Sequence, residues 1–237
     1  MEDQAHTSIS RARLFGAGAA ALAAAGLAAC GGSSEDPNES GEGFDSATPG
    51  QLGERTVAPP DPAVTKAFGP GDLGIAKYAL TLEYLEQALY EELLATGFYE
   101  GEDLALLGEI ADNEDAHVKA WERFIVEGSD SELPPRPVTR FKFDNRNQAL
   151  DMATEIEDVG AAAYLGQITR IVRGDVLSLA LSIQTAEGAH AAALARRTGL
   201  SIVPDGAIAA PLSAQEVLVL TKPFLLDKPD KAMEEIR

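Results

Sequence analysis

The chain has 237 residues, 45% of them hydrophobic, which is enough to bury a sizeable core. Its 38 acidic residues against 19 basic ones give a formal net charge of −19, which argues against nucleic-acid binding because such binding needs a basic surface. Its single cysteine excludes an internal disulfide framework and any cysteine-rich metal site.

The first 29 residues are typical of an export signal. Arg11 and Arg13 precede an apolar stretch rich in Ala and Gly, residues 14–27, which is too short to span a membrane. Residues 27–30 read Leu-Ala-Ala-Cys, which resembles the lipobox of bacterial lipoproteins. The resemblance implies cleavage before Cys30, a lipid on Cys30, and an exported protein anchored to the outer face of the bacterial cytoplasmic membrane.

Two alternatives stay open for this signal. A plain secretory signal with an incidental cysteine is the alternative to the lipoprotein form. Residues 10–15 resemble a twin-arginine signal, but Ala12 separates the two arginines, so the export route is either twin-arginine or general.

The composition changes near residue 70. Residues 30–70 are rich in Gly, Ser, Pro, Asp and Glu, and they contain few large apolar side chains. Such a segment cannot bury enough apolar surface to fold, so we predict a flexible tether there. The folded domain is then expected at residues 71–237.

Two long helices are predicted first. Apolar residues recur at helical spacing up to Gly97, with Asp72 as the N-cap and Gly97 just after the helix end. A second helix is predicted over residues 103–127, with Gly128 closing it. The turn between the two helices is short, which makes them antiparallel neighbours.

A second pair of helices follows a long connection. Residues 128–146 contain three prolines and little helical pattern, and at about 3.3 Å per extended residue they are long enough to cross a whole bundle. Helices are predicted over residues 147–172 and 175–197, the second stopped at Gly199, and the short break between them makes this pair antiparallel too. Ser213 and Glu216 have the spacing of a capping box, which predicts a short fifth helix that ends before Pro223. The predicted fold class is therefore all-α, a four-helix bundle of two antiparallel hairpins joined by a long crossover, with a short C-terminal helix.

The two predicted hairpins repeat a Glu-x-x-His motif. Glu114 and His117 lie on the second helix, and Glu187 and His190 lie on the fourth. Residues three apart project from one face of a helix. A carboxylate and an imidazole from one helical turn are good ligands for a first-row transition metal, so each motif predicts half of a metal site. The alternative is that these side chains face solvent or hold shared protons in an empty site.

The other two helices each carry a glutamate on the same stripe as a tyrosine. Glu83 is followed seven residues later by Tyr90, and Glu157 is followed seven residues later by Tyr164. Glu83 and Glu114 lie at similar distances before and after the turn of their hairpin, so both reach a similar depth of the bundle. The second hairpin repeats this spacing, because Glu157 precedes Glu187 by nearly the distance from Glu83 to Glu114.

Other residues near the predicted site carry weaker signals. Glu86 and Glu155 are alternative carboxylates, but neither of them has the repeated tyrosine. Tyr90 and Tyr164 are either partners of the ligands, by hydrogen bonding or as redox relays, or core aromatics. Trp121, four residues after His117, is interpreted as a packing residue.

One glutamate from each of two helices and Glu-x-x-His from each of the other two is the ligand pattern of ferritin-like dimetal proteins, which residues 72–199 resemble. Residues 78–86 (YALTLEYLE) and 156–166 (IEDVGAAAYLG) resemble the branch that includes plant desiccation-related proteins and many exported bacterial proteins. In that branch, as here, a Pro-Asp-Gly-Ala segment and a short helix follow the bundle, at residues 204–220.

The resemblance implies a role for each residue of the predicted site. Glu83 and Glu157 match terminal carboxylates, and Glu114 and Glu187 match bridging carboxylates. His117 and His190 match terminal imidazoles. The expected cofactor is a pair of divalent metal ions, with iron first and manganese or zinc as alternatives. Four carboxylates carry a charge that two divalent ions cancel, whereas unpaired carboxylates in a bundle would cost several kcal/mol each.

Three functions fit these expectations. The first is an oxidoreductase that uses the two metal ions to act on dioxygen or peroxide. The second is a non-enzymatic, tethered protein that sequesters iron or manganese at the cell surface. The third is a stress-protective or partner-binding bundle in which metal is only a structural pin. The sequence leaves open whether the chain forms a homodimer.

Overall fold

The computed structural model describes residues 55–226. The predicted signal segment at residues 1–29, Cys30 and the predicted tether up to residue 54 lie outside the described residues. Between residues 55 and 226, no helix combines the length and the apolar composition that crossing a membrane requires.

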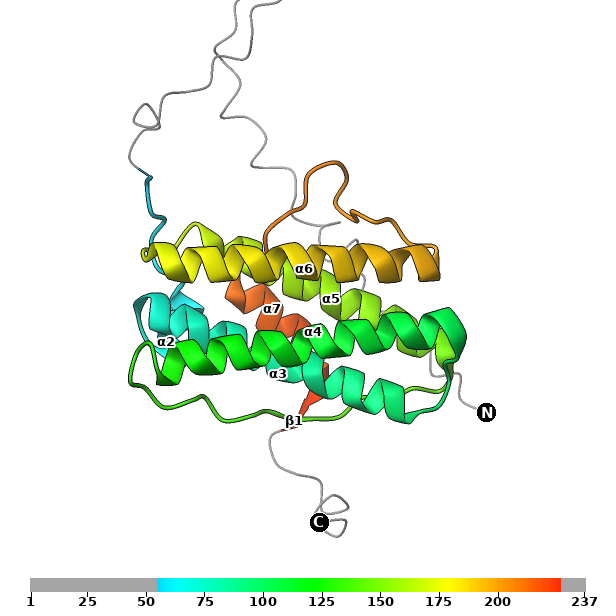
Figure 1. Cartoon of the computed structure of the whole chain (residues 1–237). Coiled ribbons are helices and arrows are strands. Elements are labelled where there is room, and N and C mark those ends of the chain that lie inside the picture. The colour runs from blue at the N-terminus through cyan, green and yellow to red at the C-terminus, as the bar shows by residue number, and fades with distance from the viewer. Residues whose placement is uncertain (1–54, 227–237) are drawn as a thin grey trace, which may run out of the picture. The chain divides into compact units, whose positions relative to one another are not determined.

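Four long helices form the fold of this part of the chain. They are α3 (Gly71–Ala95), α4 (Gly101–Val126), α5 (Arg146–Ile168) and α6 (Gly174–Thr198). Helix α3 packs along α4, and α5 packs along α6, so that each pair is an antiparallel hairpin (Figure 1). The predicted all-α bundle of two hairpins is therefore confirmed.

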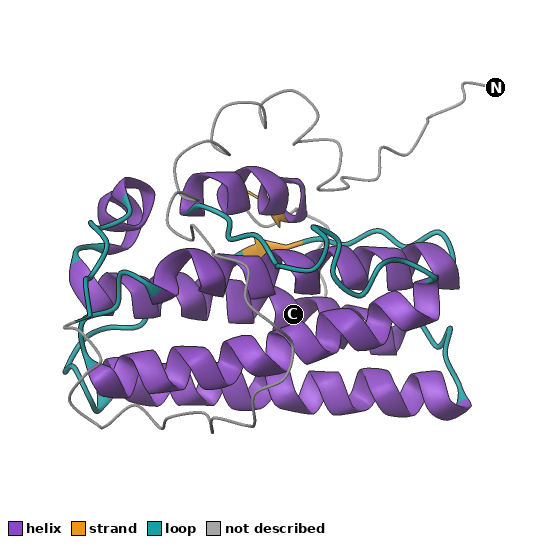
Figure 2. Ribbon diagram, turned by 90° about the horizontal axis from the view of Figure 1, so that it is seen from above, coloured by secondary structure: helices purple, strands orange, loops and turns teal. Residues whose placement is uncertain are grey.

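The connection between the hairpins spans the length of the bundle, as predicted. Residues 127–145 run beside α3 from the end of α4 to the start of α5 (Figure 1). Within them, β1 (Val138–Thr139) pairs antiparallel with β2 (Leu225–Leu226) near the end of the described chain. The short helix α7 (Ala214–Thr221) begins at the predicted capping box of Ser213 and Glu216 and is followed by a 3-10 turn, Lys222–Phe224. Figure 2 shows α7 and the strand pair on one side of the four long helices.

Two helix ends differ from the prediction. Asp72 is not the N-cap of α3, because Pro70 occupies that position. The Asp72 carboxylate instead accepts hydrogen bonds from the backbone N–H groups of Val172 and Arg173, at 2.9 and 2.7 Å, and so ties α3 to the turn between α5 and α6. Helix α5 ends at Ile168 rather than at residue 172. The apolar Ile171 that extends the helical pattern lies in this turn and is buried in the core.

The prediction of a flexible tether up to residue 70 is wrong for the last part of that segment. Residues Pro62–Phe68 form helix α2, and the folded unit that holds the bundle includes residues from Val57 onward. Val64 is 3% exposed, and the ring of Phe68 packs edge-on against Tyr78 at 5.8 Å. Asp61 caps α2 by accepting from the backbone N–H of Ala63 at 2.9 Å. These two apolar anchors and this cap help to fold a segment whose average composition is polar.

The buried core consists of two apolar clusters with a polar layer between them. On α3, the buried apolar residues up to Tyr84 belong to the first cluster, and those from Leu85 to Leu93 belong to the second. On α4, Leu107 and Ile110 belong to the second cluster, while residues from Val118 onward belong to the first. Helices α5 and α6 change clusters in the same way. Each long helix therefore crosses the polar layer once, near its middle.

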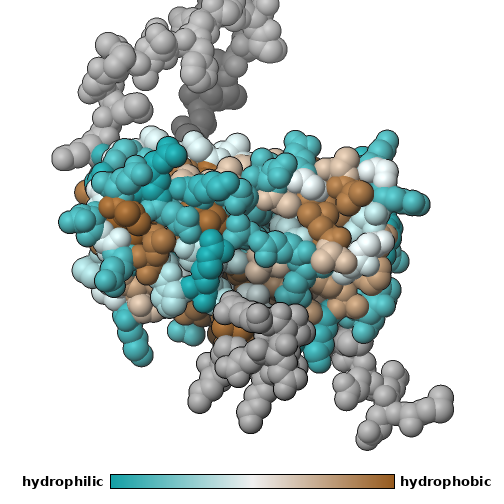
Figure 3. Space-filling view, turned by 60° about the horizontal axis from the view of Figure 1, so that its bottom comes forward, coloured by the Kyte–Doolittle hydropathy of each residue, from teal (hydrophilic) through white to brown (hydrophobic). Residues whose placement is uncertain are grey.

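The outer surface mixes hydrophilic and apolar side chains. The face in Figure 3, which brings the underside of Figure 1 forward, carries separate apolar patches among hydrophilic residues.

Candidate metal centre

The polar layer consists mainly of the residues that the sequence predicts as ligands. In two overlapping groups, each residue offers one ligand atom, and these atoms lie within 4.8 Å of one another. The first group is Glu83, Glu114, His117 and Glu187, and the second is Glu114, Glu157, Glu187 and His190. Only Glu114 and Glu187 belong to both groups. The structure thus brings all six side chains together in the arrangement of two sites that share two carboxylates.

Each imidazole faces the carboxylates of its own group. The Nδ1 atom of His117 lies 3.3 Å from Glu83 Oε2 and 3.1 Å from Glu187 Oε1. The Nδ1 atom of His190 lies 3.0 Å from Glu114 Oε1 and 3.3 Å from Glu157 Oε2. The two rings stack with 6.0 Å between their centroids. Each half of the centre therefore has one imidazole next to carboxylates from other helices.

Several polar atoms of this centre are buried without a hydrogen-bond partner among the described residues. All four glutamates are 0% exposed, and the two histidines are 9% and 5% exposed. The unpartnered atoms are Glu83 Oε2, Glu114 Oε1, Glu157 Oε2, both carboxylate oxygens of Glu187, and His190 Nδ1. Leaving one such atom unsatisfied costs about 1–3 kcal/mol, so folded proteins keep few of them. Carboxylate oxygen and imidazole nitrogen atoms that converge in one buried layer fit the donor set of a metal ion.

The metal-free centre shifts the pKa values of its own groups. Burial raises the pKa of Glu83 to about 7 and that of Glu187 well above its usual range. For Glu114 burial acts in the same direction, but hydrogen bonds with both histidines outweigh it and lower the pKa to about 2. Burial lowers the pKa of each histidine, but contacts with the carboxylates outweigh it and raise the pKa to about 12 for His117 and about 9 for His190. Without metal, both imidazoles therefore carry a proton at neutral pH and partly balance the carboxylates.

The two tyrosines hold the outer carboxylates in place. The hydroxyl of Tyr90 donates to Glu157 Oε1 at 2.5 Å, and the hydroxyl of Tyr164 donates to Glu83 Oε1. In both carboxylates the second oxygen, Oε2, has no hydrogen-bond partner among residues 55–226 and lies 3.3 Å from the Nδ1 atom of a histidine. Of the two interpretations that the sequence leaves open, the structure supports hydrogen bonding to the carboxylates. The amide of Asn113 lies 3.1 Å from His190 Nε2, a contact that the sequence does not single out.

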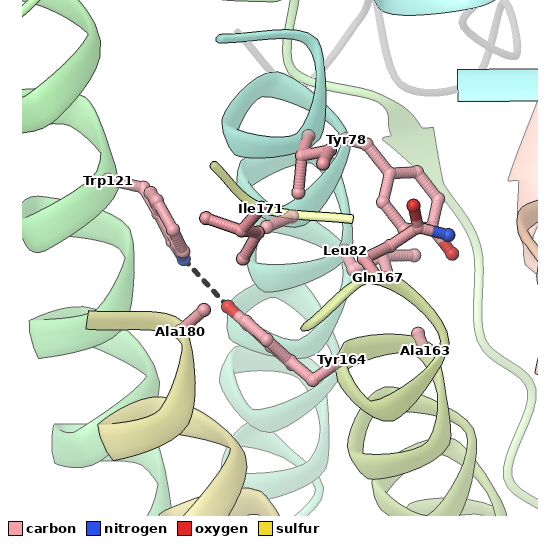
Figure 4. Close-up of a pocket in the computed structure, with 10 residues that line it drawn as sticks. Tyr78, Leu82, Trp121, Ala163, Tyr164, Gln167, Ile171 and Ala180 are labelled. Atoms are coloured by element: carbon pink, nitrogen blue, oxygen red, sulfur yellow. Dashed lines mark hydrogen bonds between the residues drawn. The ribbon is translucent and has the colours of Figure 1, made fainter. Parts of the chain in front are cut away.

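Trp121 does more than fill the core. It is 0% exposed, and its indole N–H donates to the hydroxyl of Tyr164 at 2.7 Å (Figure 4). A chain of hydrogen bonds therefore leads from Trp121 through Tyr164 to Glu83. A cavity of about 10 Å³, close to the size of one water molecule, lies beside this pair and is lined in part by Ala163 and Ala180. The only signal in the sequence is that Trp121 lies one helical turn after His117.

The two alternative carboxylates have different environments. Glu155 is half-buried and belongs to neither group. Glu86 is 2% exposed and borders the centre, although it also lies outside both groups. Burial, followed by the charges of the neighbouring carboxylates with Glu187 first, raises the pKa of Glu86 well above its usual range. The sequence offers Glu86 only as a substitute for Glu83, whereas the structure buries both.

Comparison with known proteins assigns the chain to a family. A family model for the ferritin-like domain matches residues 71–200, which is more than half of the chain and includes all six side chains of the centre. A comparison with curated proteins finds no match. The matched region coincides with the four long helices, and its buried glutamates and histidines could hold metal ions. The chain belongs to the ferritin-like domain family.

Proposed function

We propose that this protein binds two divalent metal ions, with iron first and manganese as the alternative, and that it is an oxidoreductase acting on dioxygen or peroxide; zinc could fill the same ligands but would not support this redox chemistry. The observation that carries the proposal is the pair of overlapping groups that share Glu114 and Glu187. Two ions held by shared carboxylates lie close enough to act together on one small molecule.

Each residue of the centre has a role in this proposal. Glu83 and His117 would hold one ion, Glu157 and His190 the other, and the two shared carboxylates both. When bound, two redox-active ions would supply the electrons that reduce the oxidant. The hydrogen bonds from the tyrosines occupy the Oε1 atoms, which would leave the Oε2 atoms available to the ions. The apolar clusters on both sides limit the access of water.

Charge balance supports the stoichiometry. The four carboxylates of the two groups carry four negative charges when ionised, and two divalent ions carry four positive ones. Binding replaces the protons that the metal-free centre holds on His117 and His190. With one ion, the other half of the centre would still depend on protons to balance its carboxylates, so two ions are the expected occupancy.

The test is metal content and oxygen consumption. Protein purified from its own host is expected to contain two metal ions per chain, and addition of Fe(II) to metal-free protein is expected to cause rapid oxygen uptake with a near-ultraviolet absorption band. Glu114→Ala is expected to abolish both, because it removes a shared carboxylate. Glu109→Ala is the matched control, since Glu109 is exposed on the same helix. Unchanged metal content in Glu114→Ala would refute the assignment.

The same experiment decides between the alternatives. Two ions bound without oxygen uptake would support a metal-sequestering protein. Metal that can be removed only with loss of helical content would support a stress-protective bundle in which the metal has a structural role. The resemblance to desiccation-related proteins suggests such a link to stress.

We also propose that the chain is an exported lipoprotein, anchored through Cys30 to the outer face of the cytoplasmic membrane. The support is the sequence of residues 11–30. Cells fed radiolabelled palmitate are expected to label the protein, and Cys30→Ser is expected to abolish the label and release the protein from membranes. Labelled Cys30→Ser protein would contradict the lipoprotein form.

A further inference from the structure

A fifth buried carboxylate, that of Glu86, borders the candidate metal centre. Its side chain is 2% exposed, and its Oε2 atom has no hydrogen-bond partner within the part of the chain that the structure describes. The four charged groups that act on it most strongly are all carboxylates, with Glu187 first. A buried carboxylate in such surroundings needs either a proton or a cation.

The facing helix is shaped to receive this carboxylate. Gly160 lies on α5 opposite Glu86, and a Cβ atom at this position would lie 2.3 Å from Glu86 Oε1 and 3.0 Å from Glu187 Oε2. The carboxylates of Glu86 and Glu187 are therefore neighbours that meet over a glycine. Glycine weakens a helix interior relative to alanine, so α5 carries a less favourable residue at the one position where Glu86 needs the space.

We propose that Glu86 is a seventh protein ligand of the dimetal centre and coordinates, through its free Oε2, one of the ions that Glu187 would share. This inference rests on the proposed metal binding. Glu86 belongs to neither group of converging ligand atoms, so its side chain would have to rotate to coordinate an ion. Coordination would give a partner to Glu86 Oε2, which has no hydrogen-bond partner among the described residues.

The competing explanation is that Glu86 stays a neutral acid. Two divalent ions already cancel the charge of the other four carboxylates, so a protonated Glu86 would leave the centre balanced. Glu86→Gln separates the two explanations, because an amide resembles the neutral acid in shape and charge but is a far weaker metal ligand than a carboxylate.

The test is a cobalt titration of metal-free protein, followed by calorimetry and by visible absorption. Loss of an outer partner of a metal ligand lowers affinity by about 10–100-fold, so loss of a direct ligand in Glu86→Gln is expected to weaken at least one Co(II) by more than about 10-fold. The Co(II) bands are expected to intensify, because Co(II) with fewer ligands absorbs more strongly. Glu155→Gln, a half-buried glutamate outside the centre, is the matched control and is expected to bind like the unaltered protein.

Each outcome is informative. If the unaltered protein binds no Co(II), the proposed function itself fails. If it binds two ions, and Glu86→Gln binds them equally well or more tightly, only the seventh ligand is overturned and the neutral acid is supported.

A second variant decides the matter if Glu86→Gln does not reach the helical content of the unaltered protein. Gly160→Ala places a methyl group 2.3 Å from Glu86 Oε1, too close for the carboxylate to stay, and is expected to weaken Co(II) binding by displacing it. Unchanged binding in Gly160→Ala would overturn the proposal. Where both variants fold, the double variant is expected to bind Co(II) about as weakly as Glu86→Gln alone. If Gly160→Ala weakens binding by the same factor whether residue 86 is Glu or Gln, its effect comes from helix packing and the proposal is overturned.

Discussion

Three buried tyrosines offer a direct test of the hydrogen bonds around the centre. Tyr164 both donates to Glu83 and accepts from Trp121, whereas Tyr90 only donates to Glu157. The hydroxyl of Tyr78 is buried as well but has no hydrogen-bond partner in the described structure. Changing each tyrosine to phenylalanine removes one oxygen atom and leaves the ring.

The structure sets the order of the three effects. Tyr164→Phe leaves two buried groups unsatisfied, the indole N–H of Trp121 and one oxygen of Glu83, at about 1–3 kcal/mol each. It is therefore expected to lower the free energy of unfolding by about 2–6 kcal/mol. Tyr90→Phe leaves one such group and is expected to lower it by about 1–3 kcal/mol. Tyr78→Phe removes an unpartnered hydroxyl and is expected to be neutral or to stabilise the protein by up to about 1–3 kcal/mol.

Urea unfolding, followed by circular dichroism with linear extrapolation, measures these changes. The protein must be metal-free, since bound ions would add their binding free energy to the folded state. Tyr78→Phe serves as the control for loss of a hydroxyl in itself. Equal destabilisation by Tyr78→Phe and Tyr164→Phe would refute the reasoning, because the hydrogen bonds would then contribute nothing beyond packing.

Two further predictions concern protons and the N-terminal segment. Because the pKa values of His117 and His190 are raised from 6.5 to about 12 and about 9, their contribution to the stability of the metal-free fold is fully present below pH 6.5 and is lost as pH rises through these values. Metal binding must displace these protons, so calorimetry in buffers of different ionisation enthalpy is expected to show proton release at pH 7 and an affinity that rises with pH. Binding without proton release would contradict the prediction that both histidines are protonated in the metal-free protein. Asp61 accepts from the N–H groups of Ala63 and Ala214 and from the amide of Gln167, so Asp61→Ala is expected to destabilise the fold by about 2–4 kcal/mol in urea unfolding. A change below about 0.5 kcal/mol would mean that α2 contributes as little as the tether that the sequence predicts.

Much of the fold was predictable because its signals are local. Apolar spacing, the glycines after α3 and α6, and the capping box of Ser213 and Glu216 depend on residues within a few positions of one another. Gly97 and Gly199 both have the left-handed backbone, with φ of 67° and 76°, which glycine adopts without strain. The same locality accounts for the Glu-x-x-His motifs, since three residues make one helical turn.

The errors arose where distant segments decide the structure. Composition alone cannot show that Val64 and Phe68 find apolar partners on α3, so the sequence predicts a tether where α2 forms. The role of Trp121 depends on Tyr164, which lies on another helix of the other hairpin. These contacts join residues far apart in the chain, and no short-range pattern encodes them.

The sequence by itself determined four amphipathic helices, their pairing into hairpins, and six side chains that could bind metal, because helical periodicity and short turns govern all three. Only the tertiary structure decided that these side chains meet in one water-poor layer between two apolar clusters. It also decided that a fifth carboxylate, Glu86, is buried against them over Gly160. The physical reason is that helix packing determines which charged groups are buried and which groups surround them. The spacing of residues along a single helix does not determine how that helix packs against the others.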